Sequence, residues 1–156
     1  MHFSVGLRRP YDDPSEVEAR ILDKAEYVEG AVTVLAEKQS LDRETYHENR
    51  EQQAIVEREF QTAIEACIDI AGLLLRALEE SMPETYAGRF SVLEDCDVLS
   101  SETSDRMRKA AGFRNILVHQ YGDEIENEKV YEHLQTELPC LVRYLREIRT
   151  VLNTND

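Results

Sequence analysis

The chain has 156 residues, of which 42% are apolar and 32% charged, and its 32 acidic residues outnumber 18 basic ones to give a formal net charge of −14. This length predicts one domain, and so acidic a chain is not expected to attach broadly to nucleic acid or to anionic membranes. No apolar run approaches the ~20 residues of a membrane-spanning helix and no secretory signal is visible, so we expect a cytoplasmic protein without a membrane partner.

The N-terminal part of the chain is predicted to form one amphipathic helix. Residues 1–12 show no periodic pattern, and we interpret them as a flexible arm ahead of a single domain over residues 13–156. Asp13 and Pro14 fit the N-cap and the first position of a helix. From residue 15 to about residue 39, apolar side chains recur at steps of three and four residues, which predicts a helix with one buried stripe.

A second helix is predicted over about residues 43–80 and would be unusually long. Its first part, residues 45–53, is almost wholly polar, so we expect it either to extend into solvent or to meet a partner chain. Asp69 lies within the apolar run that follows. It is either an exposed flank of the helix or an inward-facing group that orients Arg114 or Asn115, because a buried carboxylate needs a partner.

The rest of the chain also has helical patterns. A short helix is predicted over about residues 86–96, and another begins at residues 100–101 and ends near residues 118–120. A last helix covers about residues 127–152, in which Pro139 should introduce a kink. Since no strand alternation or repeat is visible, the predicted fold class is all-α, an up-down bundle of four to five helices.

A basic segment, residues 106–121 (RMRKAAGFRNILVHQY), stands out from the acidic chain because it contains no Asp or Glu. Its basic residues are Arg106, Arg108, Lys109 and Arg114, and it ends in the pattern R-N-x-x-x-H-x-Y formed by Arg114, Asn115, His119 and Tyr121. Arginine binds phosphate oxygens bidentately and histidine exchanges a proton near neutral pH, so the segment suits a phosphate-handling site. The structural alternative is a helix cap, in which Arg and His contact the last carbonyl groups.

The cysteines and histidines give no metal-binding pattern. Cys67, Cys96 and Cys140 are far apart, without a C-x-x-C motif, and the four histidines lack metal-ligand spacing. We therefore expect neither a zinc site nor a disulfide framework, and a mechanism that needs no metal and no cofactor.

Residues 113–121, FRNILVHQY, resemble the R-x-x-x-x-H-x-Y signature of HEPN-domain ribonuclease toxins of the HepT kind. Residues 56–71 resemble the long central helix of that family and residues 130–148 its last helix, so the resemblance covers most of residues 15–152. It implies a HEPN-like bundle and an endoribonuclease toxin, which is held in check by a minimal nucleotidyltransferase antitoxin.

RNA is cleaved without a metal when its own 2′-hydroxyl attacks the neighbouring phosphorus, a reaction that needs a base, an acid and positive charge. His119 fits the acid-base role, Arg114 the charge, and Asn115 would orient the phosphate or His119. Helical residues five apart lie roughly 140° around the axis from each other, so Arg114 and His119 of one chain cannot fully converge unless the helix ends between them. HEPN ribonucleases use a composite site, so the resemblance implies a homodimer or a higher oligomer that cleaves RNA, either tRNA or mRNA.

The remaining residues of the basic segment have two interpretations each. Arg106, Arg108 and Lys109 either line the approach of the RNA backbone or form a solvated helix flank. Tyr121 either packs its ring and donates a hydroxyl hydrogen bond or, as the resemblance implies, accepts AMP from the antitoxin. Adenylate beside Arg114 and His119 would block the phosphate site.

Two other functions fit the sequence. The first is a non-catalytic helical module that binds a nucleotidyltransferase or a nucleotide, in which Arg114 and His119 are structural or hold the partner's phosphates. The second is a structural subunit in which the motif is a helix cap. Cleavage of RNA in the presence of a chelator would separate a ribonuclease from both.

Overall fold

The computed structural model describes residues 14–121 and 124–153; the predicted arm at residues 1–12 and the predicted N-cap Asp13 lie outside the described residues. Over this part of the chain there are seven helices and no strand: α1 (Pro14–Lys38), α2 (Arg43–Glu48), α3 (Arg50–Ala77), α4 (Tyr86–Asp95), α5 (Ser101–His119), α6 (Asn127–Thr136) and α7 (Leu138–Asn153). None of these helices is both long and apolar enough to cross a membrane. The predicted all-α class is confirmed.

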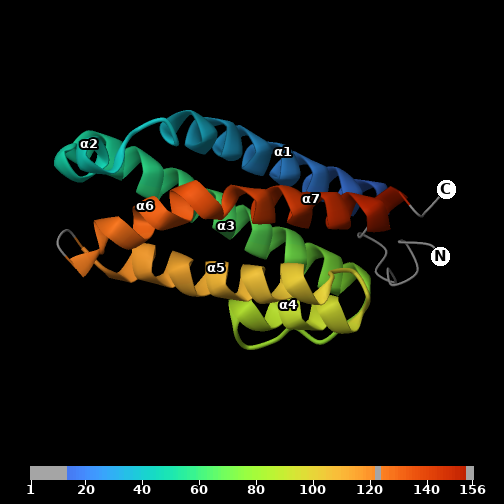
Figure 1. The fold of residues 1–156 in the computed structure, drawn as a ribbon. Helices are drawn as coiled ribbons and strands as arrows, with labels where there is room; N and C mark the ends of the chain where they lie inside the picture. The colour runs from blue at the N-terminus through green and yellow to red at the C-terminus, as the bar shows by residue number, and fades with distance from the viewer. Residues whose placement is uncertain (1–13, 122–123, 154–156) are drawn as a thin grey trace.

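The helices form an up-down bundle (Figure 1). Helix α1 packs along α3, α5 packs on α3, α7 contacts both α1 and α5, and the short α4 covers the outer side of α5. Large side chains such as Phe60, Phe90 and Tyr144 are fully buried between them. The Tyr144 hydroxyl donates a hydrogen bond of 2.8 Å to the carbonyl of Cys67, so this buried hydroxyl has a partner.

The helix predicted over residues 43–80 is in fact two helices, because the chain breaks at Asn49. The backbone of Asn49 is extended (φ −117°, ψ 95°), and its side chain caps α3 by accepting a hydrogen bond from the amide of Gln52. Gln53 is buried, and its amide donates to the carbonyls of Tyr46 at 2.9 Å and His47 at 3.1 Å. Gln53 thus supplies hydrogen bonds to carbonyls at the end of α2, where the Tyr46 carbonyl also accepts from the Asn49 amide at 3.3 Å.

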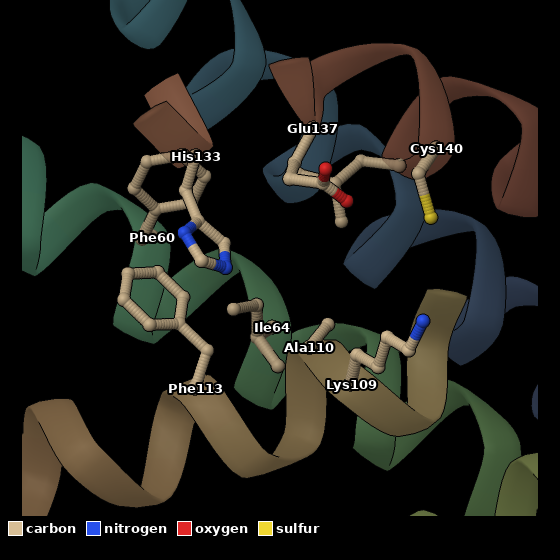
Figure 2. Close-up of a pocket in the computed structure, with 9 residues that line it drawn as sticks. Phe60, Ile64, Lys109, Ala110, Phe113, His133, Glu137 and Cys140 are labelled. Atoms are coloured by element: carbon tan, nitrogen blue, oxygen red, sulfur yellow. The ribbon is translucent and has the colours of Figure 1, made fainter. Parts of the chain in front are cut away.

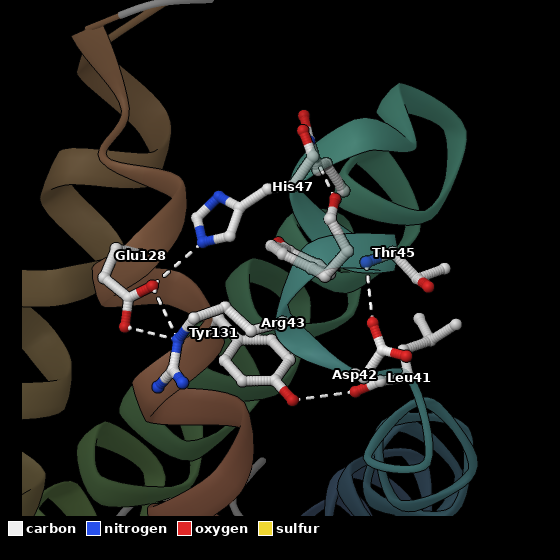
Figure 3. Close-up of polar contacts among 9 residues, drawn as sticks. Leu41, Asp42, Arg43, Thr45, His47, Glu128 and Tyr131 are labelled. Atoms are coloured by element: carbon white, nitrogen blue, oxygen red, sulfur yellow. Dashed lines mark hydrogen bonds and ion pairs between the residues drawn. The ribbon is translucent and has the colours of Figure 1, made fainter.

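The polar segment around α2 packs against α6 and does not extend into solvent as a free helix, whereas a contact of its exposed residues with a partner chain stays a prediction. Tyr46 is fully buried, and polar contacts join α2 to α6 (Figure 3). The Glu128 carboxylate accepts hydrogen bonds of 2.9 and 3.0 Å from Nε of Arg43 and lies 2.9 Å from Nε2 of His47. The Tyr131 hydroxyl donates to the Leu41 carbonyl at 2.8 Å.

We expect acidic pH to weaken the polar contacts between α2 and α6. The hydrogen bonds from His47 and Arg43 hold the pKa of the Glu128 carboxyl below its usual range. A carboxyl whose pKa is lower in the folded state stabilises the fold above its unfolded-state pKa, and this contribution is lost as the pH falls through the folded-state pKa. Amide hydrogen exchange of residues 43–48 should therefore speed up, relative to that of α5, below about pH 4.3.

Glu128→Gln is the control for this effect, because glutamine cannot titrate. The variant should show weaker protection of α2 at neutral pH and a smaller acid-dependent step, because the Asp42 carboxyl, which caps α2 and has a pKa lowered by the hydrogen bond from the Thr45 amide, still titrates. If both proteins lose α2 protection at the same pH, Glu128 does not carry the pH dependence.

The last predicted helix is likewise divided. Helix α6 ends at Thr136 and α7 begins at Leu138, directly before Pro139. Proline has no amide hydrogen and its ring clashes with the carbonyl four residues earlier, so the helical ladder is interrupted here. Instead of the kink predicted at Pro139, the structure has a complete break directly before it, and the two divided helices explain why seven helices are found instead of five.

Candidate functional site

The basic segment lies on α5, whose two ends are well defined. At the start, the Ser100 hydroxyl accepts a hydrogen bond from the amide of Thr103, and the Glu147 carboxylate of α7 accepts from the Ser100 amide at 2.8 Å. At the other end, Gln120 leaves the helix and its amide donates to the Ile116 carbonyl at 3.0 Å. Because α5 is continuous to His119, the Arg114 and His119 side chains of one chain leave the axis roughly 140° apart.

Phe113 fixes α5 in the core next to the motif. Its ring meets that of Phe60 edge to face at 5.5 Å and stacks on His133 at 4.1 Å (Figure 2). The cavity beside these rings measures about 20 Å³. Since a single water needs about 10–15 Å³, this cavity is too small for a substrate.

The guanidinium of Arg114 is held in a fixed position. Its Nη2 and Nε lie 2.9 and 3.0 Å from one carboxylate oxygen of Glu65 on α3, and its Nη1 donates to Oδ1 of Asn115 at 3.2 Å. The Tyr86 ring lies against it, 5.4 Å from Cζ to the ring centroid. Only 18% of the Arg114 side chain is exposed. Because these contacts already hold the guanidinium in place, it can bind a phosphate without a further loss of side-chain freedom.

The inward orientation considered for Asp69 is wrong, and the exposed-flank interpretation is right. The Asp69 side chain is 56% exposed and lies 3.6 Å from Nζ of Lys24 on α1. Glu65, one helical turn earlier on α3, is the carboxylate that contacts Arg114. Its longer side chain spans the gap to α5.

Two residues around Arg114 are absent from the sequence prediction. Glu65 and Asp69 are four residues apart and share one face of α3. The sequence alone therefore does not show which of the two carboxylates contacts Arg114. Tyr86 is the first residue of α4 and carries no signal in the sequence, since its contact with Arg114 depends on how α4 packs.

His119 and Tyr121 lie at the exposed end of α5. His119 is the last residue of the helix and is exposed. Tyr121 follows the cap and is 77% exposed; its backbone amide donates to the Glu124 carboxylate at 3.2 Å. Its hydroxyl forms no hydrogen bond with any residue in the described ranges, so the structural interpretation, a packed ring with a bonded hydroxyl, is wrong.

The structure does not gather the other basic residues of the segment around Arg114. Each is paired with a carboxylate of the same chain: Arg106 with Glu137 at 3.0 Å, Arg108 with Asp105 at 3.4 Å and Glu94 at 3.5 Å, and Lys109 with Asp105 at 3.3 Å. Arg106 therefore faces the start of α7, whereas Arg108 faces α4. Their role in lining an RNA path stays a prediction. Within residues 14–121 and 124–153, no group of three or more His, Cys, Asp or Glu side chains is arranged to hold a metal ion.

Comparison with known proteins identifies the family of the chain. The family model described as Ribonuclease HepT-like matches residues 21–148. A tRNA nuclease HepT from Aphanizomenon flos-aquae is 30% identical over 116 residues, which are 74% of this chain and 78% of that protein.

Solved structures share the fold. A crystal structure of a toxin-antitoxin with AMP-PNP has a TM-score of 0.78 at 23% identity, covering 85% of this chain and 98% of that chain. A tri-AMPylated HEPN toxin from Shewanella oneidensis in complex with MNT antitoxin has a TM-score of 0.76 at 24% identity, covering 84% and 97%. The resemblance seen in residues 113–121 is thus confirmed over most of the chain, which belongs to the ribonuclease HepT-like family.

Proposed function

We propose that the protein is the endoribonuclease toxin of a toxin-antitoxin pair and cleaves RNA without a metal. The observation that carries the proposal is the fixed Arg114 guanidinium, held by Glu65 and Asn115, on the same helix as an exposed histidine. The family match supports the ribonuclease activity. Relatives named as a tRNA nuclease and an mRNA nuclease support RNA, either tRNA or mRNA, as the substrate, and the proposed site of action is the cytoplasm.

The chemistry follows from the side chains. A base removes the proton of the 2′-hydroxyl, and the 2′-oxygen forms a bond to phosphorus while the bond to the 5′-oxygen breaks. An acid then protonates the leaving 5′-oxygen, which gives a 2′,3′-cyclic phosphate and a free 5′-hydroxyl. Arg114 keeps hydrogens on Nη1 and Nη2 beyond those used by Asn115 and Glu65, and these can bind the phosphorane oxygens.

Two chains are proposed to supply one active site. One chain offers one His119, whereas the reaction uses a base and an acid. Arg114 and His119 also diverge on a continuous helix. Both difficulties disappear when two copies of α5 face each other across a two-fold axis, so that the two histidines flank one phosphodiester beside the arginines. Ile116 is 41% exposed between the two motif residues and is suited to such a contact.

A mixing experiment tests both parts of this proposal. Purified protein should cleave RNA in excess EDTA and leave 2′,3′-cyclic phosphate ends. When wild-type and His119→Ala chains are unfolded, mixed in equal amounts and refolded, only wild-type dimers keep both histidines. Activity should therefore fall to about a quarter of that of wild type at the same total concentration.

The contrary results separate the claims. Activity of one half would mean that each chain works alone, and the shared site would be rejected. No cleavage by any mixture, in EDTA or with added divalent metal, would reject the ribonuclease. It would favour a non-catalytic module that binds a nucleotidyltransferase or a nucleotide.

Tyr121 is the proposed acceptor of AMP from a minimal nucleotidyltransferase antitoxin. The hydroxyl would attack the α-phosphate of ATP, which forms a phosphodiester with tyrosine and releases pyrophosphate. The 77% exposure of Tyr121 makes it accessible to another protein. The AMPylated HEPN toxin, solved with its MNT antitoxin, supports a partner of this kind.

A further inference from the structure

A second concentration of positive charge lies in a recess of about 260 Å³ between α1, α3 and α4. Its charged lining residues, here called the basic recess, are Arg20, Lys24, Asp69, Arg76 and Arg89. Four cations and one carboxylate meet there, in a chain whose net charge is −14. The basic segment on α5 contributes none of them.

Arg89 is a fixed part of the basic recess. Its Nη1 donates to the Ile68 carbonyl at 3.1 Å and lies where a side chain at position 72 would be: a Cβ on Gly72 would come within 2.6 Å of that nitrogen. The Nε of Arg89 is buried and has no hydrogen-bond partner within the described residues. A buried donor without an acceptor is rare in folded proteins, and an anion at the accessible part of the guanidinium would stabilise this cation electrostatically.

The other cations are available to a ligand. Arg20 and Arg76 are exposed, and neither forms an ion pair with any residue of the described ranges. Lys24 is the exception, since it lies 3.6 Å from Asp69. The basic recess therefore keeps a net positive charge after its one internal pair.

The basic recess is continuous with Arg114. The Tyr86 ring, 42% exposed, lies against both guanidinium groups, 5.1 Å from that of Arg89 and 5.4 Å from that of Arg114. Glu65, which holds Arg114, shares one face of α3 with Asp69, Gly72 and Arg76, because their spacing is four, three and four residues. Both sites thus belong to one surface.

We propose that the basic recess binds backbone phosphates of the RNA strand whose scissile phosphate lies at Arg114. The inference rests on the proposed ribonuclease function. Phosphates of one strand are joined at short intervals, so a strand that enters the active site must continue over the neighbouring surface. On this face, the basic recess offers guanidinium groups that bind phosphate without reading sequence. A free nucleotide could bind the same guanidinium groups, but it would not explain why the basic recess is continuous with Arg114.

The test is the binding of a short 2′-O-methyl RNA, which cannot be cleaved by its own 2′-oxygen. Arg20→Gln and Arg76→Gln should each weaken binding by about fivefold at 0.1 M salt and lower the slope of log K against log salt by about 0.7. Asp69→Asn removes a carboxylate that repels phosphate, so it should tighten binding. Arg146→Gln, a matched change at an exposed arginine of α7, should leave both the affinity and the slope unchanged.

The outcomes are distinct from those of the cleavage assay. If the protein cleaves RNA but the Arg20 and Arg76 variants bind like Arg146→Gln, the inference is wrong and the ribonuclease stands. If these variants lose affinity while no protein cleaves RNA, the basic recess binds RNA and the proposed catalysis is wrong. If ATP or inorganic phosphate binds there and 2′-O-methyl RNA does not compete, the basic recess is a free-anion site and the inference is overturned.

Discussion

Arg114→Ala and His119→Ala should each reduce RNA cleavage by about 10²–10⁴-fold while leaving the protein folded. Loss of Arg114 removes the fixed positive charge from the phosphorane oxygens. Loss of His119 removes the proton transfer at the 2′-oxygen and the 5′-oxygen. The measurement is the initial rate of cleavage of a labelled RNA in EDTA, with thermal unfolding recorded for every variant.

Two further variants make this result specific. Arg146→Ala removes an exposed arginine far from the motif and should cleave like wild type. Glu65→Gln keeps an oxygen that can accept a hydrogen bond from Arg114 but loses the ion pair, so the rate should fall less than in Arg114→Ala. If both Arg114→Ala and His119→Ala cleave RNA at the wild-type rate, the motif is not catalytic.

Tyr121→Phe should abolish transfer of AMP to the protein by its nucleotidyltransferase partner. Phenylalanine keeps the ring but has no hydroxyl to attack the α-phosphate of ATP. Adenylate adds bulk and negative charge next to Arg114 and His119, so the modified wild-type protein should lose cleavage. The variant should stay active in the presence of partner and ATP. Labelled AMP incorporation and RNA cleavage, measured on the same samples, check both statements.

Tyr27→Phe is the matched control, because Tyr27 is also exposed, at 52%, but lies on α1. It should be labelled and inhibited like wild type. Labelling that persists in Tyr121→Phe would mean that another residue accepts AMP.

Much of the fold could be predicted because local signals agree with the packing. The α5 start at Ser100 and the interruption at Pro139 follow from capping chemistry and from the missing amide hydrogen of proline. The break at Asn49 was missed because the residues around it are polar on all sides, so no change of periodicity marks it. It depends on Tyr46 entering the core and on Gln53 reaching back to α2.

The site was predictable only where its residues are close in the sequence. Arg114, Asn115, His119 and Tyr121 form one motif, and the structure places all four on α5 or directly after it. The partner of Arg114 lies 49 residues away on α3, and choosing Glu65 over Asp69 requires the distance between two helices. The same limit applies to Arg106, whose partner Glu137 lies 31 residues away, at the C-cap of α6.

The position of Tyr121 beyond the helix cap determines how the proposed toxin could be held in an inactive form. Its ring supports no part of the core, so another protein can reach the hydroxyl while every helix stays formed. Under the proposed control by AMP, the modified protein would be inactive but fully folded. Hydrolysis of the phosphodiester between AMP and Tyr121 would then restore its activity, without synthesis or refolding of the chain.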